Sequence, residues 1–346
     1  MNRHFLYTLF KRAYVQNSIN IFLFPISLGI LIVGNKKSFV ATYHLIERKL
    51  TKGSFNNAIA IRQKTFELQI SILRWLGYDF ISPCDLTVKK GVLITIDDGY
   101  SATYNSLLEL NLMPKIPILH FISPGFYLDK EIKPWWYELE DIILGKSFDL
   151  ARLKSVMLVH GAKTSSIDMS ASNDPTLLYN TLRASLIEVS NQVRETILSD
   201  YSNYKDIERQ DYRGLFMDEK ALLSGLNTTF SYGAHTYSHI ALNAEDLEII
   251  DRELNECDAQ IQRAVGSAVT SFAYPYGIES PSAIVREKLG SRYSQIYTTR
   301  YGFINSRTDL KSIPRISLSE SDGILGFINK ISGSYNFLYR IFNGSA

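Results

Sequence analysis

The sequence predicts an α/β fold in which about seven strands alternate with helices, as a parallel barrel or as an open doubly wound sheet. Residues 92–96 are a short apolar run that ends at a turn signal, which is typical of a buried parallel strand. Residues 243–265 carry apolar side chains at helical spacing. Between 124 and 213 no strand pattern is found, which indicates a helical insertion.

The expected elements divide the chain into three regions. Residues 1–37 form an apolar and basic segment, 38–320 form the main domain with the insertion at about 124–213, and 321–346 form a helical tail. Strands are expected at 38–43, 92–96, 116–123, 228–232, 269–274, 294–298 and 313–318. Helices are expected at 56–76, 101–112, 137–144, 177–198, 218–226, 281–289, 324–342 and 243–265, the last capped by Asn243 and ended by Gly266.

Composition limits the partners. The 346 residues include 37 Lys and Arg against 35 Asp and Glu, so no nucleic-acid partner is expected. The two cysteines, Cys84 and Cys257, have no metal-binding spacing and favour a reducing compartment. The apolar run at 19–33 is short and contains Pro25. It is an interfacial anchor, an uncleaved signal anchor or a helix packed on the domain; we favour peripheral membrane contact or packing.

Two adjacent carboxylates, Asp97 and Asp98, follow the strand at 92–96. Active sites of α/β folds lie at the carboxyl ends of strands. Like charges this close repel, and burial raises their pKa, so the pair requires a cation or a shared proton. A helix N-cap is the alternative, but one carboxylate would suffice for it.

Two histidines, His235 and His239, lie four residues apart after another expected strand. On a helical turn both imidazoles point the same way and reach one metal ion. The alternative is a pair of surface or capping histidines. Two histidines and one carboxylate form a catalytic metal set, and the second carboxylate is then free to act as a base.

Two aromatic motifs complete the candidate site. FAYPYG at 272–277 is a strand that leads into a rigid turn, and its backbone N–H groups suit an oxyanion hole. An ordinary strand-ending turn is equally compatible with it. Trp135 and Trp136 either stack on sugar rings or pack the insertion onto the main domain.

In this order, ITIDDGY at 94–100, HTYSH at 235–239 and FAYPYG at 272–277 resemble the polysaccharide deacetylase family, the NodB-homology domain of family 4 carbohydrate esterases. Similarity to members encoded for surface-polysaccharide biosynthesis extends over further blocks, at 41–44, 66–86, 134–136, 297–302 and 313–315. The resemblance implies a distorted (β/α) barrel with a metal site at the carboxyl ends of its strands.

The resemblance also implies residue roles. Asp97 is the general base, the Tyr276 N–H stabilises the oxyanion, and the metal, usually Zn²⁺, is bound by Asp98, His235 and His239. Trp135, Trp136 and Tyr274 are the expected contacts to an N-acetylated glycan substrate.

The chain departs from the family pattern at two positions. Ala273 stands where many members have an arginine that orients the base, and we expect Arg315 to replace it. No histidine follows His239, so the late Leu-x-His motif is absent and the acid is His44 or Asp97 itself.

The predicted function is metal-dependent removal of N-acetyl groups from an amino sugar of a surface polysaccharide, an O-antigen or a glycolipid precursor. The alternatives are a non-catalytic glycan-binding relative and a hydrolase of O-acetyl groups or small amides. The protein is expected to be bacterial and cytoplasmic or membrane-associated, with secretion left open and peripheral membrane contact through residues 19–33.

Overall fold

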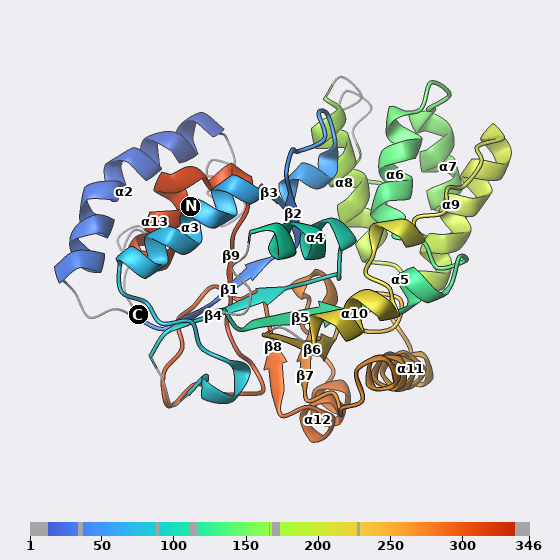
Figure 1. Cartoon of the computed structure of the whole chain (residues 1–346). Helices are drawn as coiled ribbons and strands as arrows, with labels where there is room; N and C mark the ends of the chain where they lie inside the picture. Colours follow the sequence, from blue (N-terminus) through green and yellow to red (C-terminus); the bar gives the residue numbers. More distant parts are fainter. Residues whose placement is uncertain are drawn as a thin grey trace.

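A computed structural model gives the arrangement of the chain (Figure 1). It describes residues 13–33, 37–87, 90–110, 116–165, 167, 174–226 and 229–335.

One sheet of seven parallel strands forms the centre of the molecule, in the order β8-β7-β6-β5-β4-β1-β9. The segment that ends in the last strand joins the two sides of the sheet. Ile313 pairs with Tyr297 of β8, and Ile316 then pairs with Ala41 of β1. The sheet therefore curls into the predicted distorted barrel. The strands are β1 (Phe39–Tyr43), β4 (Val92–Ile96), β5 (Ile118–Ile122), β6 (Phe230–Ala234), β7 (Ser271–Ala273), β8 (Gln295–Tyr297) and β9 (Ile316–Ser317).

Helices cover the sheet, and all five residues of β1, β4 and β5 are buried, as expected for parallel strands. Helix α11 packs an apolar stripe of Ile250, Leu254, Cys257 and Ile261 into the core, whereas Leu247 is exposed. The covering helices are α3 (Gln63–Trp75), α4 (Ser101–Glu109), α10 (Glu219–Gly225), α11 (Leu247–Val265) and α12 (Ala283–Arg292).

Two predicted helix starts are wrong. The segment expected to be helical from residue 56 first forms a 3-10 turn, η1 (Phe55–Ala58), and then β3 (Ala60–Arg62), which pairs with β2 (Leu45–Glu47). Strand pairing outweighs the local helical pattern there. Helix α11 begins after Asp246 rather than at Asn243, but it ends as predicted at Gly266, whose φ of +73° suits glycine.

The described residues of the insertion form helices joined by loops, with no strand among them: α5 (Gly125–Leu128), α6 (Trp135–Leu144), α7 (Leu150–Val159), α8 (Pro175–Ile187) and α9 (Asn191–Lys205). The single helix predicted at 177–198 is two helices, because Ser190 caps a new one by accepting a hydrogen bond from the Val193 N–H. These helices share an apolar core that is distinct from the main core of the barrel.

The two ends of the described chain lie side by side (Figure 1). Helix α2 (Ala13–Val33) packs on α13 (Gly323–Ser332), and Ser27 Oγ donates to Asn329 Oδ1 at 2.6 Å. No described helix is long and apolar enough to span a bilayer. The tail predicted to be helical to 342 is helical to Ser332, and residues 336–346 lie outside the described part.

The domain boundaries stay a prediction. Short 3-10 turns are η2 (Pro83–Asp85), η4 (Arg213–Leu215), η5 (Pro275–Gly277) and η6 (Glu320–Asp322).

Candidate active site

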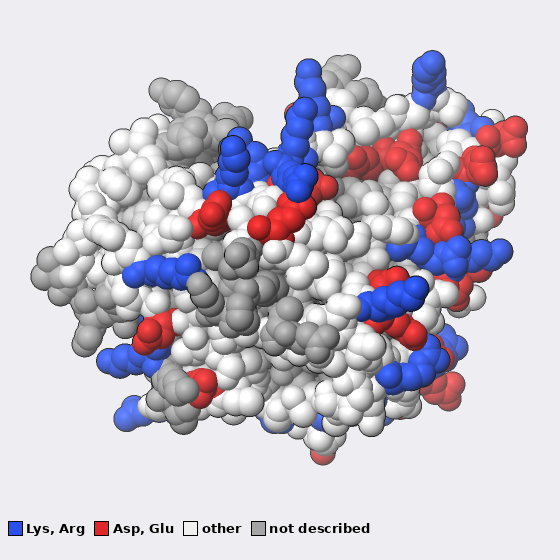
Figure 2. Space-filling view, viewed as in Figure 1, with Lys and Arg blue, Asp and Glu red and all other residues white. Residues whose placement is uncertain are grey.

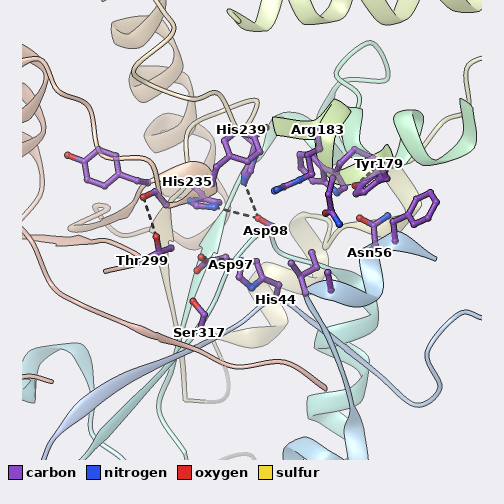
Figure 3. A pocket seen from close by; sticks show the side chains of 18 residues that line it. His44, Asn56, Asp97, Asp98, Tyr179, Arg183, His235, His239, Thr299 and Ser317 are labelled. Atoms are coloured by element: carbon purple, nitrogen blue, oxygen red, sulfur yellow. Dashed lines mark hydrogen bonds and ion pairs between the residues drawn. The ribbon is translucent and has the colours of Figure 1, made fainter. Parts of the chain in front are cut away.

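A cavity of about 340 Å³ opens at the carboxyl ends of the strands. Asp97 and Asp98 enter it directly after β4, and His235 directly after β6 (Figure 3). Tyr274 lines it directly after β7. The volume lies in the range of pockets that enclose small ligands or one sugar residue. A cavity therefore lies at the carboxyl ends of the strands, where the sequence predicted the site.

Asp98, His235 and His239 meet in this cavity, and their ligand atoms all lie within 4.8 Å of one another. The Nε2 atoms of His235 and His239 are 3.5 and 3.2 Å from Asp98 Oδ1 (Figure 3). The helical turn expected at 235–239 is wrong: the segment is a loop, and His239 itself has a φ of +57°. A left-handed backbone in a non-glycine residue is strained and is found where a side chain must be aimed.

The chemistry of these three residues fits a divalent metal. Asp98 Oδ1 is buried and has no hydrogen-bond partner, which is costly unless a cation faces it. His235 Nδ1 lies 2.8 Å from the Ala273 carbonyl oxygen, so its N–H is donated there and the Nε2 lone pair faces the cavity. Burial lowers the pKa of His239 to about 4, which keeps its imidazole neutral and able to bind a metal at neutral pH.

Asp97 is held separately from the metal set. The Arg315 guanidinium donates to both of its carboxylate oxygens, at 2.7 and 2.9 Å, and is itself almost fully buried. Burial raises the pKa of Asp97, but Arg315 and then His44 outweigh that effect and hold the pKa below its usual value. His44 lines the cavity with Nε2 3.7 Å from Asp97 Oδ2. Asp97 is therefore ionised and fixed in orientation.

The turn after β7 brings Tyr276 to the cavity. Tyr276 is the second residue of η5, so its N–H has no acceptor within that turn, and its φ is +57°. Its ring lies 4.5 Å from the His239 ring, edge to face. Trp135 donates its indole N–H to the Tyr276 hydroxyl at 2.6 Å.

The predicted sugar contacts divide in two. Trp136 and Tyr274 line the cavity, and the Trp136 ring lies 4.9 Å from that of His239. Trp135 does not line the cavity; it is buried behind Tyr276 and packs the insertion onto the barrel. Trp135 thus has the alternative role that its position allows, packing of the insertion, with its indole N–H donated to Tyr276.

Sequence reasoning missed one wall of the cavity, which Tyr179, Asn180 and Arg183 form from α8. These positions lie on one face of a helix, but nothing in the sequence says that this face meets the barrel. The other lining residues that were not predicted are Phe55, Asn56, Ala58, Ile59, Thr299 and Ser317.

His120 lies apart from this chemistry, within β5. It is fully buried against Phe230, and burial lowers its pKa to about 3. A neutral imidazole in the core agrees with the structural role that its position in a strand predicts.

Comparison with known proteins points to one family. The family model described as polysaccharide deacetylase matches residues 217–294, a stretch that holds His235, His239 and Tyr276. No curated protein matches the chain. The resemblance to this family that the sequence motifs predict is confirmed, and the match agrees with the predicted class of enzyme, a hydrolase of carbon–nitrogen bonds.

Three solved structures share the fold. The deacetylase PplD of Streptococcus pyogenes, in complex with acetate, has a TM-score of 0.51 and 14% identity over 86% of this chain and 99% of its own. IcaB of Ammonifex degensii has a TM-score of 0.50 and 15% identity over 86% and 97% of the two chains. A de-N-acetylase of Aggregatibacter actinomycetemcomitans has a TM-score of 0.50 and 12% identity over 85% and 99%.

Proposed function

We propose that the chain is a metal-dependent hydrolase that removes the N-acetyl group from an amino sugar of a surface polysaccharide, an O-antigen or a glycolipid precursor. One observation carries the proposal: three buried metal-ligand side chains converge beside a carboxylate that Arg315 holds apart from them. That division would supply a metal site and a base within one cavity, which supports the proposal.

Asp98, His235 and His239 would hold the ion, with Zn²⁺ as the metal best suited to this nitrogen and oxygen set. When bound there, the ion would polarise the acetamide carbonyl and lower the pKa of a water molecule. Asp97 would accept the proton of the attacking water. Arg315 would keep the carboxylate in the orientation that this transfer needs.

The Tyr276 N–H would donate to the oxyanion of the tetrahedral intermediate. Cleavage of the C–N bond then requires a proton on the leaving amine. His44 lines the cavity beside Asp97 and can supply that proton, and Asp97 can return the one it received. The products are acetate and a free amino sugar.

The direct test measures metal content and acetate release together. Purified protein is analysed for bound metals and incubated with N-acetylated and O-acetylated glycans and with small N-acetyl amides. We expect bound Zn²⁺ and acetate release from an N-acetylated glycan. Release from O-acetyl groups or small amides alone would favour the alternative hydrolase activities.

Variants locate the metal site. Asp98→Ala and His235→Ala should each abolish metal binding and acetate release, because either change leaves two ligands. His160→Ala is the matched control: His160 pairs with Asp200 on the surface, outside the cavity, and its loss should change neither quantity. Activity that survives Asp98→Ala contradicts the proposal.

A non-catalytic glycan-binding relative is the second candidate, favoured by Ala273 and by the absence of histidines after His239. It predicts that glycan binding is equal in the wild type and in Asp97→Asn, with no acetate released by either. Acetate release by the wild type excludes it.

Peripheral membrane contact through residues 19–33 belongs to the same proposal, with the protein in the cytoplasm of a bacterium or at its membrane. Helix α2 contains no charged residue, and its outer face exposes Ile21, Phe22 and Ile32, with Phe22 67% exposed. Its inner face is fixed by Ser27 and Asn20, which hydrogen-bond Asn329. Charged side chains of both signs lie on other parts of the surface in Figure 2, whereas the described residues of α2 include none.

Vesicle sedimentation tests this contact. The wild type should sediment with vesicles of phosphatidylglycerol and phosphatidylethanolamine, and Phe22→Asp should weaken that binding. Leu158→Asp is the control, because Leu158 is equally exposed but lies in the insertion. Equal sedimentation of all three proteins would remove the membrane contact from the proposal.

A further inference from the structure

Arg183 is a cationic side chain of the cavity that pairs with no described acidic residue. It projects from α8, is half-buried, and takes part in no ion pair or hydrogen bond among the described residues. Its guanidinium lies over the Tyr276 ring, whose centre is 5.9 Å from the guanidinium carbon. A guanidinium has five N–H donors, so this contact leaves its hydrogen-bonding capacity unused.

The two carboxylates of the cavity are already engaged. Asp97 is neutralised by Arg315, and Asp98 lies in the cluster that would hold the cation. Among the described residues that line the cavity, Arg183 is the only lysine or arginine. The cavity therefore has one uncompensated positive charge, on the side formed by the insertion.

The position of Arg183 is set by packing. Tyr179, one helical turn before it, stacks on Phe55 with ring centres 4.6 Å apart and donates its hydroxyl to the Trp136 carbonyl. Asn180 lines the cavity on the same face of α8. In Figure 3, Arg183, Tyr179 and Asn56 lie together on one side of Asp98, opposite Thr299.

We propose that Arg183 binds an anionic group of the substrate, a phosphate or a carboxylate carried by the sugar whose acetamide is cleaved or by its immediate neighbour. This inference rests on the proposed function and narrows its substrate to an acidic glycan or a phosphorylated glycan precursor. A planar guanidinium pairs with both oxyanions through two parallel hydrogen bonds. Tyr276 connects the two ends of the site, because its ring contacts both Arg183 and His239.

Acetate release from three probes tests the inference: methyl N-acetylglucosaminide, N-acetylglucosamine 1-phosphate and N-acetylglucosaminuronic acid. The wild type should have a kcat/KM at least about tenfold higher for one anionic probe than for the neutral one. The preferred anionic probe distinguishes a phosphate from a carboxylate. In Arg183→Gln that ratio should fall to about one.

Arg152→Gln is the matched control. Arg152 also lies over a tyrosine ring of the insertion, at 3.8 Å from Tyr204, but it does not line the cavity. In Arg152→Gln, the ratio of kcat/KM for the preferred anionic probe to kcat/KM for the neutral probe should equal that of the wild type.

A binding measurement separates Arg183 from the metal, which also attracts phosphate. Calorimetry of N-acetylglucosamine 1-phosphate and of N-acetylglucosaminuronic acid with chelator-treated protein should show binding of the preferred probe that weakens at least about tenfold in Arg183→Gln. Turnover of the neutral probe with no anionic preference, or a preference that Arg183→Gln retains, overturns the inference and leaves the proposed function standing. Acetate release from no N-acetylated glycan overturns the proposed function itself.

Discussion

The two sides of the cavity differ in how they are built. The floor comes from the ends of parallel strands, where Asp97, Asp98 and His235 follow directly on β4 and β6. The facing wall comes from α8 of the insertion, which contributes Tyr179, Asn180 and Arg183. Strand ends within one barrel hold side chains in fixed relation, so the floor suits chemistry. The wall packs mainly in the second apolar cluster rather than on the ends of β4 and β6, so it suits substrate selection.

The floor should respond most strongly to loss of its base. Asp97→Asn should lower kcat by roughly a hundredfold to ten-thousandfold, because a positioned general base contributes about that much. Metal content should stay at the wild-type level, since Asp97 is not among the three clustered ligands. Metal analysis and initial rates of acetate release measure the two quantities. A variant that loses its metal would show that the two aspartates do not have separate roles.

Arg315 links the floor to stability. Arg315→Met leaves the Asp97 carboxylate buried without its main partner, which should lower the free energy of unfolding by roughly 3–5 kcal/mol. Urea unfolding at pH 7 measures this. Arg300→Met is the control: Arg300 pairs with Glu279 on the surface, and its loss should cost about 1 kcal/mol or less.

The same variant changes the pH dependence. Arg315 lowers the pKa of Asp97, so its removal should raise that pKa and move the acidic limb of kcat/KM to higher pH. In the wild type, the stability gained from the lowered pKa is present at neutral pH and lost as the pH falls through the range below about 4. An acidic limb that stays in place in Arg315→Met would contradict the assignment of Asp97 as the base.

The floor could be predicted from the sequence because its residues lie within short contiguous motifs. Asp97 and Asp98 are adjacent, and the apolar strand before them predicts which edge of the sheet they reach. Even there, the predicted helical turn at 235–239 is wrong. The segment is a loop in which His239 has a φ of +57°, a conformation that depends on tertiary packing. Arg315 was singled out only because Ala273 departs from a family pattern.

The wall could not be predicted, for physical reasons. The pattern of 177–198 continues through the break between α8 and α9, so periodicity alone hides the cap at Ser190. Which face of α8 meets the barrel depends on contacts distant in sequence, such as the stack of Phe55 on Tyr179. The packing of Trp135 depends on the same kind of contact, because its partner Tyr276 lies 141 residues away.

A wall variant should alter binding more than chemistry. Asn180→Ala removes a polar side chain that lines the cavity, so KM for the glycan should rise roughly fivefold, the value of about one hydrogen bond, with a smaller change in kcat. Steady-state kinetics separate the two. Asn203→Ala, on the exposed face of α9, is the control. A fall in kcat without a rise in KM would place Asn180 with the floor.

The smallest expected effect concerns how far wall and floor fold together. Ser190→Ala removes the cap of α9, and Asp218→Ala removes the cap of α10, where Asp218 accepts from the Ala221 N–H. Each should lower the free energy of unfolding by about 1 kcal/mol. The apolar core of the insertion also contains Tyr100 and Phe216, which lie outside the insertion in the sequence. Because the two regions share this core, we expect them to unfold in one cooperative transition.

Two signals can be compared in those variants. Fluorescence reports mainly on Trp135 and Trp136, which are buried, whereas far-ultraviolet circular dichroism reports on the whole chain. If the two regions unfold as one unit, both variants shift both signals to the same midpoint. If Ser190→Ala shifts the fluorescence alone, the wall opens independently of the floor.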